Sequence, residues 1–230
     1  MIVMKPLIFV ALGLLVVAQG QERSVAFSDD SRPRTVHVEI LDGTLNIRAH
    51  AGKDVTVSSP ALDRDQLRVS QANNTVTIAG ANRGRMVVLV PQDTSLLVRC
   101  ANCRETLIEN VRGDLDISTR NGSIRLVNVS GSILAHSLNK NIHAVIGQLD
   151  PSKPSSFTSM NGNIDCTFPA DLKADVKMRT ENGQIHTEFD IQLTGGLPIR
   201  TDRGVSGRIG GGGPELQLRA FNGSIYIRKK

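Results

Sequence analysis

The sequence predicts an all-β protein, a single β-solenoid of about seven rungs with a less regular N-terminal β section. Short units of a turn followed by a strand recur along the second half of the chain. Side chains of one kind return at matched positions on both sides of each turn. Aromatic residues, which supply much of the volume of a conventional globular core, are scarce, with no Trp, one Tyr and six Phe. A helical pattern is almost absent, so stacked coils are favoured over a conventional globular domain.

The first part of the chain predicts a signal peptide over residues 1–20. Lys5 provides a positive charge, residues 7–18 are apolar, and small residues at the positions that a signal peptidase reads favour cleavage after Gly20. An uncleaved membrane anchor is the alternative, but an apolar stretch of about a dozen residues is short for a bilayer. We therefore expect an exported protein, periplasmic or at the cell surface, with no stable membrane span after cleavage. Its first residues, 21–35, are expected to be a flexible segment.

The section from residue 36 to residue 91 predicts short strands without strict register. Alternating apolar residues between turn residues place these strands at residues 36–40, 45–47, 55–57, 66–69 and 75–78. We expect this section to be an irregular cap over one end of a stack, because the open ends of solenoids need covering. Met86–Pro91 would then lead into the regular rungs at 92–230.

An Asn-Gly turn followed by a strand is the repeated unit. Asn-Gly accepts the positive φ values that tight turns need, and alternation then places every second side chain on one face. The unit begins at Asn121, Asn161, Asn182 and Asn222, and Asn139 begins a variant with Lys140 in place of Gly. The last interval between units is 40 residues, 183 to 223, and predicts two rungs of about twenty residues each.

Matched columns of side chains favour stacked rungs. The inward column after the turns would hold Ile124, Ile142, Ile164, Ile185 and Ile225. The turns would carry an asparagine ladder, interrupted at Arg203, of Asn121, Asn139, Asn161, Asn182 and Asn222. Rungs about 4.8 Å apart bring like side chains together, and amides can then bond from rung to rung. A meander or β-sandwich with Asn-Gly hairpins is the alternative, and it explains the turns but not the columns.

Two of the three cysteines form a CxxC motif. In an exported protein Cys100 and Cys103 are a disulfide candidate, with Cys100 on an inward column and Cys103 at a turn. Free thiols and a redox dithiol are the alternatives, although Arg99 and Arg104 flank the pair without the helix that usually stabilises a thiolate. A single CxxC is weak support for zinc. Cys166 alternates with apolar residues and is expected to fill the core.

A metal site is a hypothesis for the outward face. The position after the repeated Ile holds His143, Asp165 and His186, which on consecutive rungs would place two imidazoles and a carboxylate about 5 Å apart. Zinc or copper suits such ligands. A solvated polar face of mixed residues is the alternative.

Composition argues against several functions. Without Lys5, 26 Lys and Arg stand against 22 Asp and Glu, a formal charge of +4, and no basic stripe predicts nucleic-acid binding. Asp114 and Asp116 share one face of a strand, but the aromatics that would grip a sugar for glycoside hydrolysis are missing. No nucleophile elbow or phosphate-binding loop occurs. We therefore expect neither an enzyme nor a cofactor.

Several motifs together resemble the bacterial "putative adhesin" domain of unknown function. They are Val90-Pro91, Leu96-Leu97-Val98, Val111-Arg112-Gly113-Asp114-Leu115, Asn121-Gly122-Ser123-Ile124 and the later Asn-Gly units, within residues 36–228. The resemblance implies an exported β-solenoid of the cell envelope with no established catalytic residues. The sequence departs from the family pattern at Cys103 and Lys140.

The expected function is structural or adhesive, with an envelope protein, a glycan or a second copy of the chain as partner. The alternative is a glycan- or metal-binding module that uses the face of His143, Asp165 and His186. A contiguous exposed apolar patch would favour a protein partner. A concave pocket lined with convergent polar groups would favour a ligand.

Overall fold

The computed structural model describes residues 22–29, 31–62, 66–193 and 204–230, and its elements there are nineteen β-strands. The predicted all-β class is confirmed. The predicted signal peptide at 1–20 and the interruption at Arg203 lie outside the described residues. No helix in the described part is long and apolar enough to cross a bilayer.

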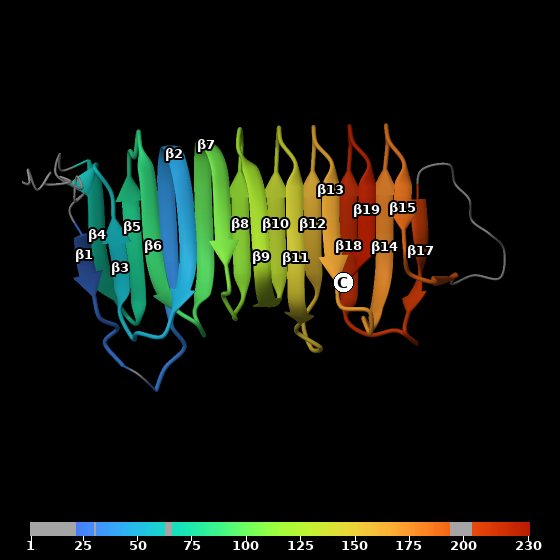
Figure 1. Cartoon of the computed structure of the whole chain (residues 1–230), viewed down its shortest axis with the longest axis horizontal. Coiled ribbons are helices and arrows are strands. Elements are labelled where there is room, and N and C mark those ends of the chain that lie inside the picture. The colour runs from blue at the N-terminus through green and yellow to red at the C-terminus, as the bar shows by residue number, and fades with distance from the viewer. Residues whose placement is uncertain (1–21, 30, 63–65, 194–203) are drawn as a thin grey trace, which may run out of the picture.

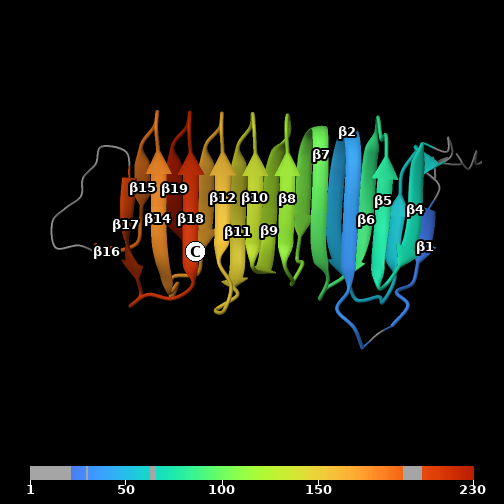
Figure 2. The same ribbon diagram turned by 180° about the vertical axis from the view of Figure 1, so that it is seen from behind.

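Most strands belong to layers, each made of a strand in a front sheet, a turn, and a strand in a back sheet. The front sheet is the one nearer the viewer in Figure 2. The layers made of two strands are β5 (Thr75–Gly80) with β6 (Arg85–Pro91), β8 (Leu115–Thr119) with β9 (Ser123–Gly131), β10 (Ile133–Ser137) with β11 (Ile142–Leu149), β12 (Ser155–Ser159) with β13 (Ile164–Phe168), β14 (Ala174–Thr180) with β15 (Ile185–Thr187), and β18 (Glu215–Ala220) with β19 (Ile225–Lys229). Two further layers are single long strands, β2 (Thr35–His50) and β7 (Ser95–Glu109), which run through both sheets.

Neighbouring layers in the middle of the molecule pair in parallel and in register. Ala135 of β10 pairs with Ile117 of β8 and with Phe157 of β12. Alternate side chains therefore point between the sheets, where they form one continuous buried core. Phe157 and Phe168 meet there edge to face, with ring centroids 6.4 Å apart. The turns line one long edge of the stack, the upper edge in Figure 1.

The C-terminal layers do not follow chain order, so the prediction of two further rungs between 183 and 223 is wrong for the residues described there. The last layer, β18 with β19, lies between the β12–β13 layer and the β14–β15 layer, because Leu218 pairs with both Phe157 and Met178. Between β15 and β18 the described chain forms β16 (Gln192–Leu193) and β17 (Gly204–Ile209), and β17 runs antiparallel along the other edge of β14. β17 occupies the outer edge of β14, so the last layer takes the inner one.

The N-terminal section is more regular than the sequence predicts. β2 pairs in parallel with β5 and β6 on one side and with β7 on the other, so this section holds two full layers. Its irregular part is a cap of antiparallel strands: β3 (Val55–Ser58) on β6, β4 (Leu67–Ala72) on β5, and β1 (Glu22–Val25) on β3. The expected flexible segment therefore includes a paired strand, β1. Alternation alone could not show these pairings, because the layers are 40 residues apart in sequence, as Thr35 and Thr75 are.

Candidate functional site

The three residues of the predicted metal site are not on consecutive layers. His143 pairs with Asp165, but the next residue in this column is Tyr226, which pairs with both Asp165 and His186. The His186 ring stacks on the Tyr226 ring, with centroids 4.8 Å apart and an interplanar angle of 5°. No group of three or more His, Cys, Asp or Glu in the described residues could hold a metal ion. The predicted set of ligands is wrong because the last layer inserts Tyr226 into it.

Asp165 is instead engaged by a cation of the inserted layer. Arg228 donates to its two carboxylate oxygens from Nε at 2.8 Å and from Nη2 at 3.2 Å. The hydrogen bond to Asp165 and the charge of that carboxylate raise the pKa of the Arg228 guanidinium. This ion pair therefore joins the inserted layer to the neighbouring layer on the back face.

The turns carry a continuous asparagine ladder. From Asn121 onward, each side-chain amide nitrogen donates to the side-chain carbonyl oxygen of the asparagine one layer closer to Asn102, over N···O distances of 2.6 to 2.9 Å. In spatial order the ladder is Asn102, Asn121, Asn139, Asn161, Asn222 and Asn182. Sequence reasoning missed Asn102, because Cys103 follows it where Gly stands in most other units. The amides satisfy one another, so this column supports the stack rather than a ligand.

A second polar ladder runs along the other side of the turns and was not predicted. The Asn141 side-chain oxygen accepts from the backbone N–H of Asn163 at 2.9 Å, and the Asn163 side-chain oxygen accepts from that of Ser224 at 2.8 Å. The sequence carried a signal for this second ladder, because a polar residue stands two positions after each ladder asparagine. Like the first ladder, it stabilises the turn edge.

Cys100 and Cys103 are joined by a disulfide across the turn of β7, with Cα atoms 5.8 Å apart. The same two positions are bridged by a hydrogen bond in other layers: the hydroxyl of Thr119, which pairs with Cys100, donates to the carbonyl of Gly122 at 2.8 Å. The disulfide therefore takes the place of a hydroxyl-to-carbonyl bridge. Both cysteines are buried, which supports a structural role. Cys166 is buried in the core, and burial, with a smaller contribution from the charge of Asp165, raises the pKa of its thiol well above the usual value.

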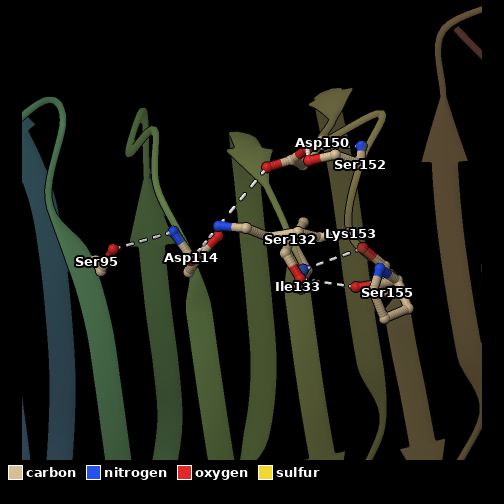
Figure 3. Close-up of polar contacts among 9 residues, drawn as sticks. Ser95, Asp114, Ser132, Ile133, Asp150, Ser152, Lys153 and Ser155 are labelled. Carbon is tan, nitrogen blue, oxygen red and sulfur yellow. Dashed lines mark hydrogen bonds and ion pairs between the residues drawn. The ribbon is translucent and has the colours of Figure 1, made fainter. Parts of the chain in front are cut away.

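At the edge opposite the turns, ion pairs and hydrogen bonds connect neighbouring layers (Figure 3). Lys153, in the loop between β11 and β12, donates to Asp114 at 2.8 Å and lies 3.9 Å from Asp150. Hydrogen bonds from the Ser152 side chain and backbone lower the pKa of Asp150. Asp116, the other member of the predicted carboxylate pair, is held by Arg99. Both carboxylates are therefore engaged in ion pairs.

A shallow hollow of about 340 Å³ lies on the front sheet near the turns, over β2, β7, β8 and β10. We call it the front hollow. Ala101 and Ser118 contribute small side chains to its lining, while Glu39, Arg120 and His136 are larger and exposed. Polar groups thus converge on a concave part of the front sheet.

An exposed apolar column continues from the front hollow toward the C-terminal layers. It consists of Leu138, Met160 and Phe221, which occupy the same position in three successive layers, each directly before a ladder asparagine. Met160 is 43% exposed and Phe221 45% exposed, and Leu138 is half-buried in the hollow's lining. Sequence reasoning missed this column, although the residue before each asparagine was available for comparison.

Solved bacterial structures share a likeness with this chain. A "putative cell adhesion protein" from Clostridium sporogenes ATCC 15579 is 10% identical with a TM-score of 0.40, and the match covers 91% of this chain and 99% of that chain. A "putative adhesin" from Bacteroides fragilis NCTC 9343 is 10% identical with a TM-score of 0.35, over 91% and 96% of the two chains. Another from Parabacteroides merdae ATCC 43184 is 7% identical with a TM-score of 0.35, over 92% and 97%. No protein-family model and no curated protein matches the sequence.

Proposed function

We propose that this protein is a non-enzymatic, exported component of the bacterial cell envelope that holds a partner protein against its front sheet. In this proposal the fold is a β-solenoid whose layers form a rigid support, and the role is adhesive or scaffolding. The observation that carries the proposal is the apolar column of Leu138, Met160 and Phe221 beside the front hollow.

The apolar column favours a protein partner on physical grounds. Single exposed apolar residues are ordinary, whereas a contiguous apolar patch on the surface favours a site of protein contact. Successive layers are about 4.8 Å apart, so the three side chains form one strip. A strip beside a hollow also suits the usual anatomy of an interface, in which a few buried anchors carry most of the binding energy.

A pull-down with point variants tests the proposal. The chain from residue 21 to residue 230 would be presented to a detergent-free envelope extract, alongside Met160→Asp and Phe221→Asp variants. The matched control is Leu193→Asp, because Leu193 is 51% exposed but lies on β16, away from the column. We expect one retained protein to be lost from both column variants and kept by the control. Equal retention by all four proteins would refute the role of the front sheet.

Cell fractionation tests export separately. We expect the full-length gene product to be recovered outside the cytoplasm in a form shortened by about 20 residues, since the predicted cleavage follows Gly20. Mass spectrometry of the recovered chain measures the cleavage point. A full-length chain recovered in the cytoplasmic fraction would contradict an envelope role.

A further inference from the structure

Charge is unevenly distributed around the front hollow. The guanidinium of Arg99 is neutralised by Asp116, since its two terminal nitrogens each donate to a carboxylate oxygen at 2.8 Å. Arg120, by contrast, is exposed and has no ion-pair partner in the part of the chain that the structure describes. The exposed His136 lies one layer further on, beside Ser118. The C-terminal side of the hollow therefore offers an uncompensated positive charge.

The acidic residue of the hollow is too far away to cancel this charge. Glu39 pairs with Arg99, and Arg99 pairs with Ser118 in the layer of Arg120, so Glu39 stands two layers from Arg120. At about 4.8 Å for each layer, this is about 10 Å along the stack. A Coulomb interaction at that distance across water is weak and strongly screened by salt.

The positive charge and the apolar column share one line. Arg120, Leu138, Met160 and Phe221 hold the same position in four successive layers, each following a residue of the paired column Thr119, Ser137, Ser159 and Ala220. Phe221 therefore lies three layers, or about 14 Å, from Arg120 along the stack. An extended peptide rises about 3.3 Å per residue, so its alternate side chains are about 6.6 Å apart and three of them span about 13 Å.

We propose that the occupant of this surface is an extended segment of a partner protein, with an acidic residue followed at the second and fourth positions by apolar residues. The segment would lie across the strands, along the stack. Its carboxylate would meet Arg120, its first apolar side chain would lie over Leu138 and Met160, and its second would reach Phe221. The inference rests on the proposed function and adds the chemistry of the partner.

Short synthetic peptides test this chemistry without the natural partner. The probe is an acetylated, amidated Gly-Glu-Ser-Leu-Ser-Leu-Gly, compared with the same peptide carrying Gln or Lys in place of Glu. Each would be titrated into the ¹⁵N-labelled chain from residue 21 to residue 230, and the shifts of amide signals would give Kd. We expect the Glu peptide to bind roughly tenfold more tightly than the Gln peptide, with shifts confined to the front sheet.

Charge variants provide the matched controls. Arg120→Glu is expected to weaken binding of the Glu peptide roughly tenfold and to strengthen binding of the Lys peptide. Glu39→Gln should leave the Kd of the Glu peptide within about twofold of the unchanged protein's value. Both side chains are exposed, so neither change should alter the thermal unfolding midpoint, which circular dichroism checks. Equal binding of the three peptides would overturn the proposal.

Two other occupants would also overturn it. A chain that sediments as a dimer, and becomes a monomer in the Arg120→Glu variant, would show that a second copy covers the surface. An acidic oligosaccharide that binds and displaces the Glu peptide would show that a glycan does. If no peptide binds while the column variants still lose a retained protein, only this inference fails and the proposed function stands.

Discussion

The middle layers and the C-terminal layers use the same turn and the same columns, yet only the middle layers stack in the order of the chain. β8 with β9, β10 with β11, and β12 with β13 follow one another in space as in sequence. The last layer returns to lie between two earlier ones. The repeated unit therefore specifies the register between adjacent layers but not which layers become adjacent.

The difference comes from what lies between the units. In the middle, short connections pass the chain directly to the next layer. Before the last layer the chain forms β17, which pairs antiparallel with β14, and then reverses at Gly210, Gly211 and Gly212, whose φ values are +61°, +89° and +96°. Such positive φ values are easily adopted by Gly. Because β14 is then paired with β17 on its outer edge, the final layer pairs with its inner edge.

The largest effect should come from removing a core side chain of the inserted layer. Leu218 is fully buried between Phe157 and Met178, and Leu126 of β9 is buried between Ile108 and Ala144. Leu218→Ala should lower the free energy of unfolding by about 3 kcal/mol, much as Leu126→Ala does, since each leaves a cavity between two layers. Urea denaturation measures both. A cost for Leu218→Ala of less than half that of Leu126→Ala would mean that the last layer lies at an end of the stack.

A substitution of the glycine in the turn of the inserted layer should give the next largest loss of stability. A Cβ on Gly223 would lie 2.3 Å from the carbonyl oxygen of Gly162 in the neighbouring layer. Gly223→Ala should therefore cost about 2 kcal/mol, because the backbones of two layers must move apart. Gly84→Ala is the control, since its Cβ would meet only Pro60 at 3.7 Å. Equal thermal midpoints for the two variants would contradict the close approach of these layers.

Some of these features could be predicted from the sequence and others could not. The all-β class, the column of Ile124, Ile142 and Ile164 and the asparagine turns follow from local alternation and turn chemistry, so they could be predicted. The position of Tyr226 between Asp165 and His186 depends on which edge of β14 was free, which is a long-range property. The predicted metal site failed for this reason.

The exposed surface was missed for a different reason. Inward columns stand out because like residues must fill a common core, whereas outward residues are less constrained and vary from layer to layer. Leu138, Met160 and Phe221 are three different side chains, so no repeat of residue type marked them. Only their position in adjacent layers, with Met160 and Phe221 exposed and Leu138 half-buried, joins them into a strip.

The disulfide turn of β7 can be converted into the turn of the middle layers. Loss of the bridge in a Cys100→Ala, Cys103→Ala variant should cost about 2 kcal/mol, as chain entropy predicts for so short a loop. The variant Cys100→Thr, Cys103→Gly should recover about 1 kcal/mol of this, because it restores the hydrogen bond that Thr119 makes to Gly122. Urea unfolding with and without reductant measures both. No difference between the two variants would mean that the disulfide does not substitute for that bond.

The asparagine ladder allows the smallest but most specific test of layer order. Asn222 lies inside the ladder, where it donates to Asn161 and accepts from Asn182. Asn182 is at the end of the ladder and makes a single ladder bond, its donation to Asn222. An exposed hydrogen bond between two side-chain amides contributes about 0.5 kcal/mol to stability. Asn222→Ala should therefore lower the free energy of unfolding by about 1 kcal/mol, and Asn182→Ala by about half of that. Asn139 lies inside the ladder in the middle layers, so Asn139→Ala should lower the free energy of unfolding by as much as Asn222→Ala. Stacking in chain order would reverse the ranking of Asn182 and Asn222, because Asn182 would then be the internal member and Asn222 the last.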